Sequence, residues 1–192
     1  GGTATTRYIH DLSGNLVKQI NPNQYVSAKD TEELAAEMEG ISYVYDRMNR
    51  LVSVYNQEGI GIRYIKYNNN GNIIKEADGL RFSGSIDSSA GTLYEYDGLN
   101  RLVRSTDTKG NITSIEYDIL DNVVNLTDAR GNATVFEYNP DRTLIKATFA
   151  DGGIIRYEYD GKGRMTRQTD QNGNTMVFEF NALEKQTLIK DA

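Results

Sequence analysis

Short runs of alternating apolar and polar residues recur along this chain, and Gly, Asn and Asp separate them. In "TSIEY" (residues 113–117), Ile115 and Tyr117 alternate with Ser114 and Glu116, a period of two that is typical of a half-buried β-strand. A neighbouring run, "RLVRST" (101–106), has the commonest strand length of about six residues. Two such runs joined by a tight turn predict a β-hairpin.

The hairpin pattern repeats with a fixed period. An aromatic residue at the end of the second run recurs every 21 residues, and upstream the same position returns at intervals of 29, 22 and 35. These anchors, from the C-terminus backwards, are Phe180, Tyr159, Tyr138, Tyr117, Tyr96, Tyr67, Tyr45 and His10. Units this small cannot bury a face alone, so we expect eight hairpins stabilised by their neighbours.

Each anchor is followed by a residue that suits the first corner of a type I turn. Asp or Asn is present there in every unit: Asp11, Asp46, Asn68, Asp97, Asp118, Asn139, Asp160 and Asn181. Gly, Asn or Asp stands three residues later, with Arg142 and Glu184 as exceptions. A second series of turns has the same pattern, Asp or Asn at the first corner and Gly three residues later. Its members are Asn56–Gly59, Asp107–Gly110, Asp128–Gly131 and Asp170–Gly173, with variants at Asn21-Pro22 and Asp151-Gly152-Gly153. We predict positive φ at Gly110, Gly131 and Gly173.

A column of glutamates provides a test of strand register. Glu95, Glu116, Glu137, Glu158 and Glu179 directly precede the aromatic anchors. If each anchor pairs with the residue seven positions later, Tyr117 faces Val124 and Glu116 faces Asn125. The same register places Glu95 opposite Arg104 and Glu158 opposite Arg167. Cross-strand attraction then makes the column a solvated charge ladder rather than a row of catalytic acids or ion ligands.

Two insertions interrupt the period. Residues 29–40, "KDTEELAAEMEG", predict a short helix with Asp30 and Glu33 as its N-terminal cap and Gly40 as its stop, which could plug or cap the curled sheet. Residues 79–91 are rich in Gly and Ser and predict a loop. The whole of 1–192 is thus expected to be one all-β domain, a curled or spiral antiparallel sheet of about sixteen strands, and part of a longer protein.

Composition narrows the function classes. The chain has 192 residues and a net charge of −6, which argues against nucleic-acid binding because such binding depends on clustered Lys and Arg. The absence of cysteine excludes disulfides, thiolate metal sites and a cysteine nucleophile. No window approaches the roughly 20 apolar residues of a membrane span. There are 13 Tyr and 5 Phe, which favours β-structure.

The candidate chemistry has simpler structural explanations. His10 occupies an aromatic anchor, and we expect a packed ring rather than a catalytic base. The D-x-x-G-N turns lack the acidic spacing of calcium loops, and the tyrosine columns, which could form a platform for sugars, are expected to pack the sheet. We therefore expect no catalytic residue, no cofactor and no metal site.

The phrases "YDGLNRLV", "YDRMNRLV", "YDGKGRMT" and "HDLSGNLV", alternating with "DTKGN", "DARGN" and "DQNGN", resemble the YD repeats of Rhs and wall-associated proteins, toxin-complex cocoon subunits and teneurins. The resemblance spans essentially the whole chain. It implies a spiral strip of antiparallel sheet that forms a hollow shell, enclosing a cytotoxic C-terminal domain in toxin members and serving adhesion in teneurins. The family's DPxG motif is missing from this sequence, so its self-cleavage does not carry over.

From this resemblance we expect a non-catalytic structural segment of a shell or scaffold that encloses or presents a toxin or surface domain. Its partners would be further repeats and the C-terminal domain of the parent protein, its location secreted or at a bacterial cell surface, and its exposed strand edges would allow edge-to-edge self-association. The alternative is a cell-surface recognition or adhesion module that binds carbohydrate or protein. An enzyme is the third and least favoured class.

Overall fold

The computed structural model describes residues 5–27, 31–181, 183 and 185–191. The chain divides into two compact units, Gly1–Tyr94 and Glu95–Ala192. Almost all regular structure is β-strand, and the described strands form one 16-stranded sheet whose neighbours follow the order of the sequence. Every register determined between neighbouring strands is antiparallel. The all-β hairpin architecture expected from the repeat is thus confirmed.

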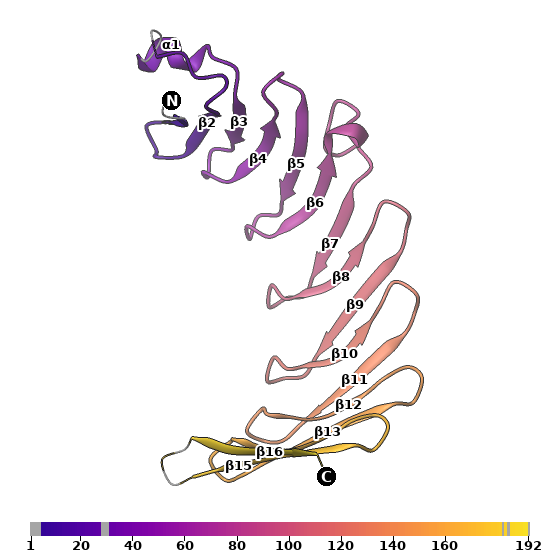
Figure 1. Cartoon of the computed structure of the whole chain (residues 1–192). Helices are drawn as coiled ribbons and strands as arrows, with labels where there is room; N and C mark the ends of the chain where they lie inside the picture. The colour runs from indigo at the N-terminus through magenta and orange to yellow at the C-terminus, as the bar shows by residue number, and fades with distance from the viewer. Residues whose placement is uncertain (1–4, 28–30, 182, 184, 192) are drawn as a thin grey trace. The chain divides into compact units, whose positions relative to one another are not determined.

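Among its described residues, the first unit contains strands β1 to β6, the start of β7, and the short helices α1 and η2 (Figure 1). Their bounds are β1 Arg7–His10, β2 Leu16–Ile20, α1 Glu32–Ala36, β3 Ile41–Tyr45, β4 Leu51–Tyr55, β5 Gly61–Tyr67, β6 Ile73–Asp78, the 3₁₀ helix η2 Gly79–Arg81, and β7 Thr92–Tyr96. The second unit contains only strands and turns among its described residues: β8 Leu102–Thr106, β9 Ile112–Tyr117, β10 Val123–Thr127, β11 Ala133–Tyr138, β12 Leu144–Thr148, β13 Ile154–Tyr159, β14 Met165–Thr169, β15 Thr175–Phe180 and β16 Gln186–Asp191.

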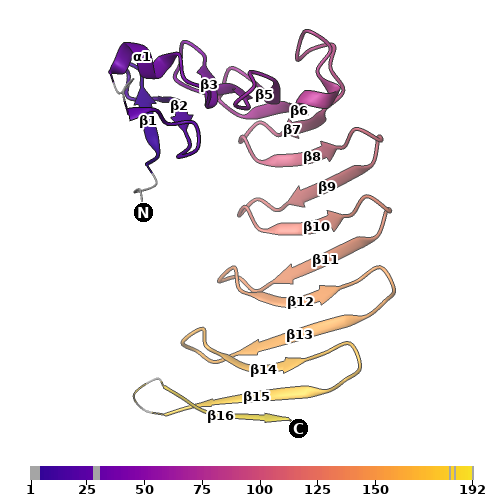
Figure 2. The same ribbon diagram turned by 45° about the horizontal axis from the view of Figure 1, so that its top comes forward.

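In the second unit the turns alternate between the two ends of the strands (Figure 2). Both turn series have the same backbone geometry. Asn100 N–H donates to Asp97 O at 3.0 Å in one series, and Gly110 N–H donates to Asp107 O at 3.0 Å in the other. Positive φ is found at Gly110 (85°), Gly131 (85°) and Gly173 (86°), as predicted. These are the positions where a residue without Cβ avoids the steric cost of the left-handed region.

The predicted register is wrong by one residue at the anchor. Tyr117 lies opposite Val123, not Val124, and Tyr138 likewise lies opposite Leu144. A β-bulge follows each of these pairs, so one strand carries an extra residue. The bulge restores the predicted pairing further along, where Glu116 lies opposite Asn125 and Glu158 opposite Arg167. Without it, a one-residue slip would have moved the glutamates to the other face.

The first unit has a small apolar core beneath its helix. Ile9, Ile20, Ala35 and Met38 are buried together, and Val17 and Tyr25 pack against them. Helix α1 therefore covers the β1–β2 hairpin (Figure 1). In the described part of the second unit, by contrast, only Ala147 and Asn122 are buried. Neighbouring strands and side-chain bonds must carry most of its stability.

The helical insertion is shorter than predicted and begins differently. Helix α1 spans Glu32–Ala36, and its N-cap is Thr31, whose hydroxyl accepts a hydrogen bond from Leu34 N–H at 3.3 Å; Asp30 lies outside the described residues. Gly40 does not end the helix. A Cβ there would lie 2.5 Å from Gln19 O, so this glycine permits a close approach between backbones.

The second insertion is folded against the sheet. Residues 79–91 begin with η2 and continue into a turn in which Ser89 N–H donates to Ser85 O at 3.0 Å. Phe82 stacks on Tyr64 of β5 with ring centroids 3.6 Å apart. The predicted loop therefore has its own turn structure and an aromatic anchor on the sheet.

Candidate functional site

The residue after each anchor closes its turn through its side chain. Asp97 Oδ1 accepts hydrogen bonds from the backbone N–H groups of Leu99 at 2.9 Å and Arg101 at 3.0 Å. The bond from the Arg101 backbone and the bond from its side chain lower the pKa of Asp97, because both favour the charged carboxylate. The same two backbone bonds are made at Asp11, Asp46, Asn68, Asp118, Asp160 and Asn181.

An arginine four residues after the aspartate joins one repeat to the next. Arg101 pairs with Asp97 Oδ2 at 2.7 Å, and its guanidinium carbon lies 4.5 Å from the ring centroid of Tyr117 in the following repeat. It also donates to Asp118 O at 3.3 Å and pairs with Asp121 at 2.5 Å. A planar guanidinium can stack and form fork-shaped hydrogen bonds at once. We call this arrangement of aspartate, arginine and following aromatic ring an arginine clasp.

Within the described part of the chain, three junctions contain an arginine clasp. Arg50 pairs with Asp46 at 2.7 Å and lies 4.6 Å from the Tyr67 ring. Arg164 pairs with Asp160 at 2.6 Å and lies 4.6 Å from the Phe180 ring. The clasps at Arg50, Arg101 and Arg164 thus link anchors that were predicted only as separate columns.

The tyrosine hydroxyls form a second link between repeats. Tyr117 Oη donates to Leu102 O at 3.0 Å, and Tyr138 Oη donates to Val123 O at 2.9 Å. Tyr45 and Tyr67 make the equivalent bonds to Leu16 O and Leu51 O. These bonds give the anchors a physical reason to be tyrosine rather than phenylalanine. Burial raises the pKa of the Tyr138 hydroxyl, since the charged phenolate would be poorly solvated there.

Two consecutive junctions of the second unit lack the arginine. Asn122 replaces it after Asp118 and donates from Nδ2 to Asp118 Oδ2 at 2.8 Å. Thr143 replaces it after Asn139 and makes only the backbone bond to Asn139 Oδ1, at 2.8 Å. In the described residues no arginine stacks on the following anchors, Tyr138 and Tyr159.

The turn conformation persists where its sequence does not. Arg142, an exception to the Gly, Asn or Asp pattern, has φ of 65°, close to the 64° of Asn100 and 67° of Asp121. An L-residue with a Cβ costs free energy in this region. The arginine side chain reaches Asn122 Oδ1 at 3.4 Å in the preceding repeat. The hydrogen-bonded hairpin therefore imposes the turn even on an unfavourable residue.

The glutamate column forms cross-strand ion pairs. Glu137 pairs with Lys146 at 2.7 Å, Glu95 with Arg104 at 3.5 Å, and Glu158 with Arg167 at 3.6 Å. The glutamate carboxylates are more than half exposed, and such pairs contribute little individually. The column is a solvated charge ladder, as predicted.

The folded insertion, residues 79–91, supplies a negative charge at a hairpin where two lysines face each other. Lys66 and Lys75 lie directly opposite each other in the β5–β6 hairpin, where like charges repel. Asp87 of the 79–91 segment forms an ion pair with Lys66 and accepts a hydrogen bond from Lys75 through its backbone carbonyl at 3.0 Å. The lysines lower the pKa of Asp87, mainly through the hydrogen bond from Lys66. The insertion thus supplies the missing negative charge.

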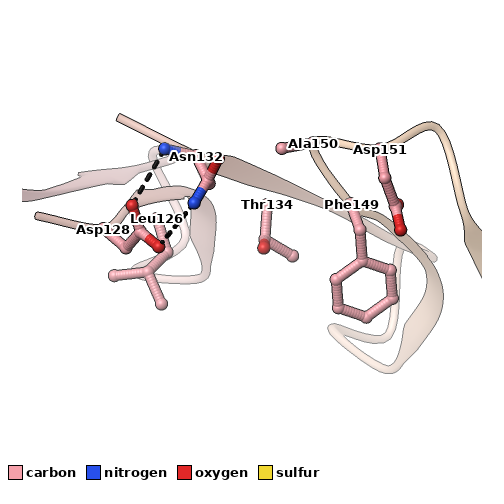
Figure 3. A pocket seen from close by; sticks show the side chains of 7 residues that line it. All are labelled: Leu126, Asp128, Asn132, Thr134, Phe149, Ala150 and Asp151. Carbon is pink, nitrogen blue, oxygen red and sulfur yellow. Dashed lines mark hydrogen bonds between the residues drawn. The ribbon is translucent and has the colours of Figure 1, made fainter. Parts of the chain in front are cut away.

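An open hollow of about 400 Å³ lies at one end of strands β10, β11 and β12. Figure 3 shows the Phe149 ring, Thr134 and Leu126 along its length, with Asp151 beside the ring and Asp128 at the opposite end. Asn132 and Ala150 complete its lining. This hollow was not predicted; the only sequence signal for it is Phe149 at a turn corner that elsewhere carries Asp or Asn.

The described residues form neither of the other candidate features, a metal site or a packed histidine. No group of His, Asp and Glu there could hold a metal ion. His10 is exposed, in contrast to the packed ring that was expected, because Ile9 is the residue whose side chain turns into the core. None of the helices in the described part is long and apolar enough to cross a membrane.

The predicted repeat positions lie at strand ends and turn corners. The anchors Tyr45, Tyr67, Tyr96, Tyr117, Tyr138, Tyr159 and Phe180 are half-buried. Sequence reasoning missed the clasp arginines, although the phrases "YDRMNRLV", "YDGLNRLV" and "YDGKGRMT" carry them at a fixed place. The signal was present, but its partner lies a whole repeat away.

Two segments of the chain, residues 96–133 and 138–175, match the RHS Repeat family. Each match begins at an aromatic anchor, Tyr96 or Tyr138. No curated protein sequence matches the chain.

Solved structures of toxin complexes show similarity over nearly the whole chain. The crystal structure of TcdB2-TccC3 is 17% identical over 99% of this chain, with a TM-score of 0.49. The Photorhabdus luminescens Tc holotoxin pore with a TccC3 mutation is 14% identical over 97% of it, with a TM-score of 0.44. This chain spans 13% and 14% of the lengths of those chains.

Proposed function

Because residues 96–133 and 138–175 match the RHS Repeat family, we propose that this chain is a non-catalytic structural segment of a larger Rhs or YD-repeat protein. It forms part of a shell or scaffold that encloses or presents a toxin or surface domain, and all of residues 1–192 act as one repeat region. Its partners are the neighbouring repeats and the C-terminal domain of the parent, which is secreted or located at a bacterial cell surface.

One observation carries the proposal: the recurring polar and aromatic side chains hold repeats to one another. In the clasp of Arg101, the carboxylate of Asp97 and the ring of Tyr117 are both engaged by the same guanidinium. In a repeat array, stability is a sum of unit and neighbour-interface terms. Side chains that join successive repeats suit a wall that must stay closed.

The test is protection of the downstream domain in the full-length parent protein. We expect limited proteolysis to cleave that domain much faster in the double variant Arg101→Ala/Arg164→Ala than in the wild-type protein. The matched control, Lys109→Ala/Arg130→Ala, removes two exposed cations from turns and should leave the cleavage rate unchanged. A downstream domain cleaved equally fast in wild-type protein and after deletion of the repeats would contradict enclosure.

The second candidate is a recognition or adhesion module that binds carbohydrate or protein. The observation that favours it is the hollow beside Phe149, where apolar and polar side chains share one open surface. Recognition requires that the 192-residue chain by itself bind a ligand, whereas a wall segment need not. Binding measurements on the chain therefore separate the two candidates.

Edge-to-edge self-association remains part of the proposal. Strands β1 and β16 are the first and last in the strand order, and exposed strand edges tend to pair with other chains. We expect light scattering to show a mass that rises with concentration. A strictly monomeric mass up to millimolar concentration would contradict this.

A further inference from the structure

Phe149 breaks the rule that the other turns of its series obey. Asp107, Asp128 and Asp170 each accept hydrogen bonds from two backbone N–H groups and one Asn side chain. Phe149 keeps the backbone geometry, with its N–H donating to Gly153 O at 2.9 Å, but it has no side chain to accept these bonds. Asp151 Oδ1 accepts only the bond from Gly153 N–H, at 2.9 Å.

Residues that break a local rule without a structural gain tend to mark functional sites. Phe149 does not enter a core: it is only half-buried, and only Ala147 and Asn122 are buried in the described part of this unit. It lies instead along the hollow with Thr134 and Leu126 (Figure 3), and Leu126 is 37% exposed. Leu126 and Thr134 are directly opposite each other in the β10–β11 pair. The three side chains form a largely apolar strip that runs from β10 across β11 to the turn after β12.

Charge gives the hollow its selectivity. Asp151 lies beside the ring and Asp128 at the far end, and the lining contains no Lys or Arg of the described chain. Asp128 uses both carboxylate oxygens within its own turn, whereas Asp151 Oδ1 makes a single backbone bond. Arg130, which lies between the lining residues Asp128 and Asn132 in the sequence, is exposed and does not line the hollow.

The same pair of groups, an aromatic ring and an aspartate, recurs in the chain with a guanidinium between them. In the clasps of Arg50, Arg101 and Arg164 the guanidinium carbon lies 4.5–4.6 Å from a ring centroid and pairs with a carboxylate at 2.6–2.7 Å. We propose that the hollow lined by Phe149 and Asp151 binds an arginine side chain of a partner polypeptide segment. The guanidinium stacks on the Phe149 ring and donates to the Asp151 carboxylate, as in the clasps within the chain.

An arginine fits this hollow better than a sugar or a lysine. Its planar cation stacks on a ring while its N–H groups form a fork toward a carboxylate, and its aliphatic stem can cover Leu126. A neutral sugar would gain nothing from the net charge of −6, whereas that charge favours the approach of a cation. The inference goes beyond the scaffold proposal and does not depend on it.

The probe is the peptide acetyl-Gly-Arg-Gly-amide, and its control is the same peptide with neutral citrulline, which keeps the shape of the arginine side chain. We expect a nuclear magnetic resonance titration of the whole chain to shift the amide signals of Thr134, Ala150 and Asp151 with the arginine peptide. The citrulline peptide should bind at least tenfold less tightly, because it lacks the charge.

Phe149→Asp is the deciding variant, since it restores the residue type that the other turns carry. We expect it to unfold at the same or a higher temperature than the wild-type chain and to bind the arginine peptide at least tenfold less tightly. Asp151→Asn should weaken binding several-fold and reduce its salt dependence. Arg130→Gln, the matched control on the neighbouring turn, should leave the affinity unchanged.

Three outcomes would overturn the proposal. One is undiminished binding by a folded Phe149→Asp chain. Another is equal binding of the arginine and citrulline peptides. The third is that maltotriose or chitotriose shifts the same amide signals more strongly than the arginine peptide, which would assign the hollow to a saccharide.

Discussion

The junctions of the second unit are of two kinds. The junctions after Asp97 and Asp160 are closed by arginine clasps on Tyr117 and Phe180. Between them, the junctions after Asp118 and Asn139 have Asn122 and Thr143 in place of the arginine. The backbone turn is the same in both kinds.

This difference separates what forms a repeat from what ties repeats together. The turn and the strand pairing are local and occur at every junction, whereas the cation that bridges two repeats is present only at some. In an array stabilised by contacts between neighbouring repeats, the interfaces with the fewest stabilising contacts unfold locally first. We expect residues 118–159 to be the first part of this unit to lose protection from hydrogen exchange.

The largest effect should come from the turns that both kinds of junction share. Gly110→Val and Gly131→Val each place a β-branched residue at φ of 85°, which should cost about 1 to 2 kcal/mol of unfolding free energy. The two costs should be equal, although Gly110 precedes a clasped anchor and Gly131 an unclasped one. Urea denaturation measures both, with Lys109→Ser as a nearly silent control. Clearly unequal costs would mean that turn and clasp are coupled.

The next effect isolates the clasp. Arg164→Ala removes the cation over the Phe180 ring and should cost about 1 kcal/mol, whereas Thr143→Ala, at the equivalent position of an unclasped junction, should cost less than about 0.5 kcal/mol. Thermal unfolding and hydrogen exchange of β15 report the difference. Equal costs would remove the distinction between the two kinds of junction.

A smaller effect concerns the hydroxyl bond, which does not depend on the arginine. Tyr117→Phe, at a clasped junction, and Tyr138→Phe, at an unclasped one, should each cost about 0.5 to 1 kcal/mol by losing one hydrogen bond to a backbone carbonyl. Tyr159, whose hydroxyl makes no bond to the described residues, provides the control Tyr159→Phe. A larger loss at Tyr159 than at Tyr117 would show that the hydroxyl bonds do not stabilise the junctions.

The smallest effect is on acid stability. Hydrogen bonds, first that from the Asn122 side chain, hold the pKa of Asp118 below its usual 3.8. The stabilisation from this carboxylate is therefore complete above pH 3.8 and is lost as the pH falls through the lowered value. Asp118→Asn should make the fall in melting temperature below pH 4 less steep, because an asparagine side chain takes up no proton in this pH range. Asn139 already occupies the equivalent position in the next repeat. An unchanged pH profile would contradict the assigned role of Asp118.

Local chemistry explains most of what could be predicted. The 21-residue period, the type I turns and the positive φ of Gly110 depend on interactions within a few residues, so the sequence determined them. The pairing of Glu158 with Arg167 followed from the same hairpin. Arg142 shows the limit of this logic, because its turn forms against the preference of the residue.

The tertiary structure decided what depends on neighbouring strands. The bulge that pairs Tyr117 with Val123 follows from hydrogen bonding across the sheet. The clasp of Arg101 on Tyr117 and the pairing of Asp87 with Lys66 join residues 16 to 21 positions apart. Such contacts exist only once the strands are side by side, because a side chain cannot select a partner across that distance until the sheet fixes both positions.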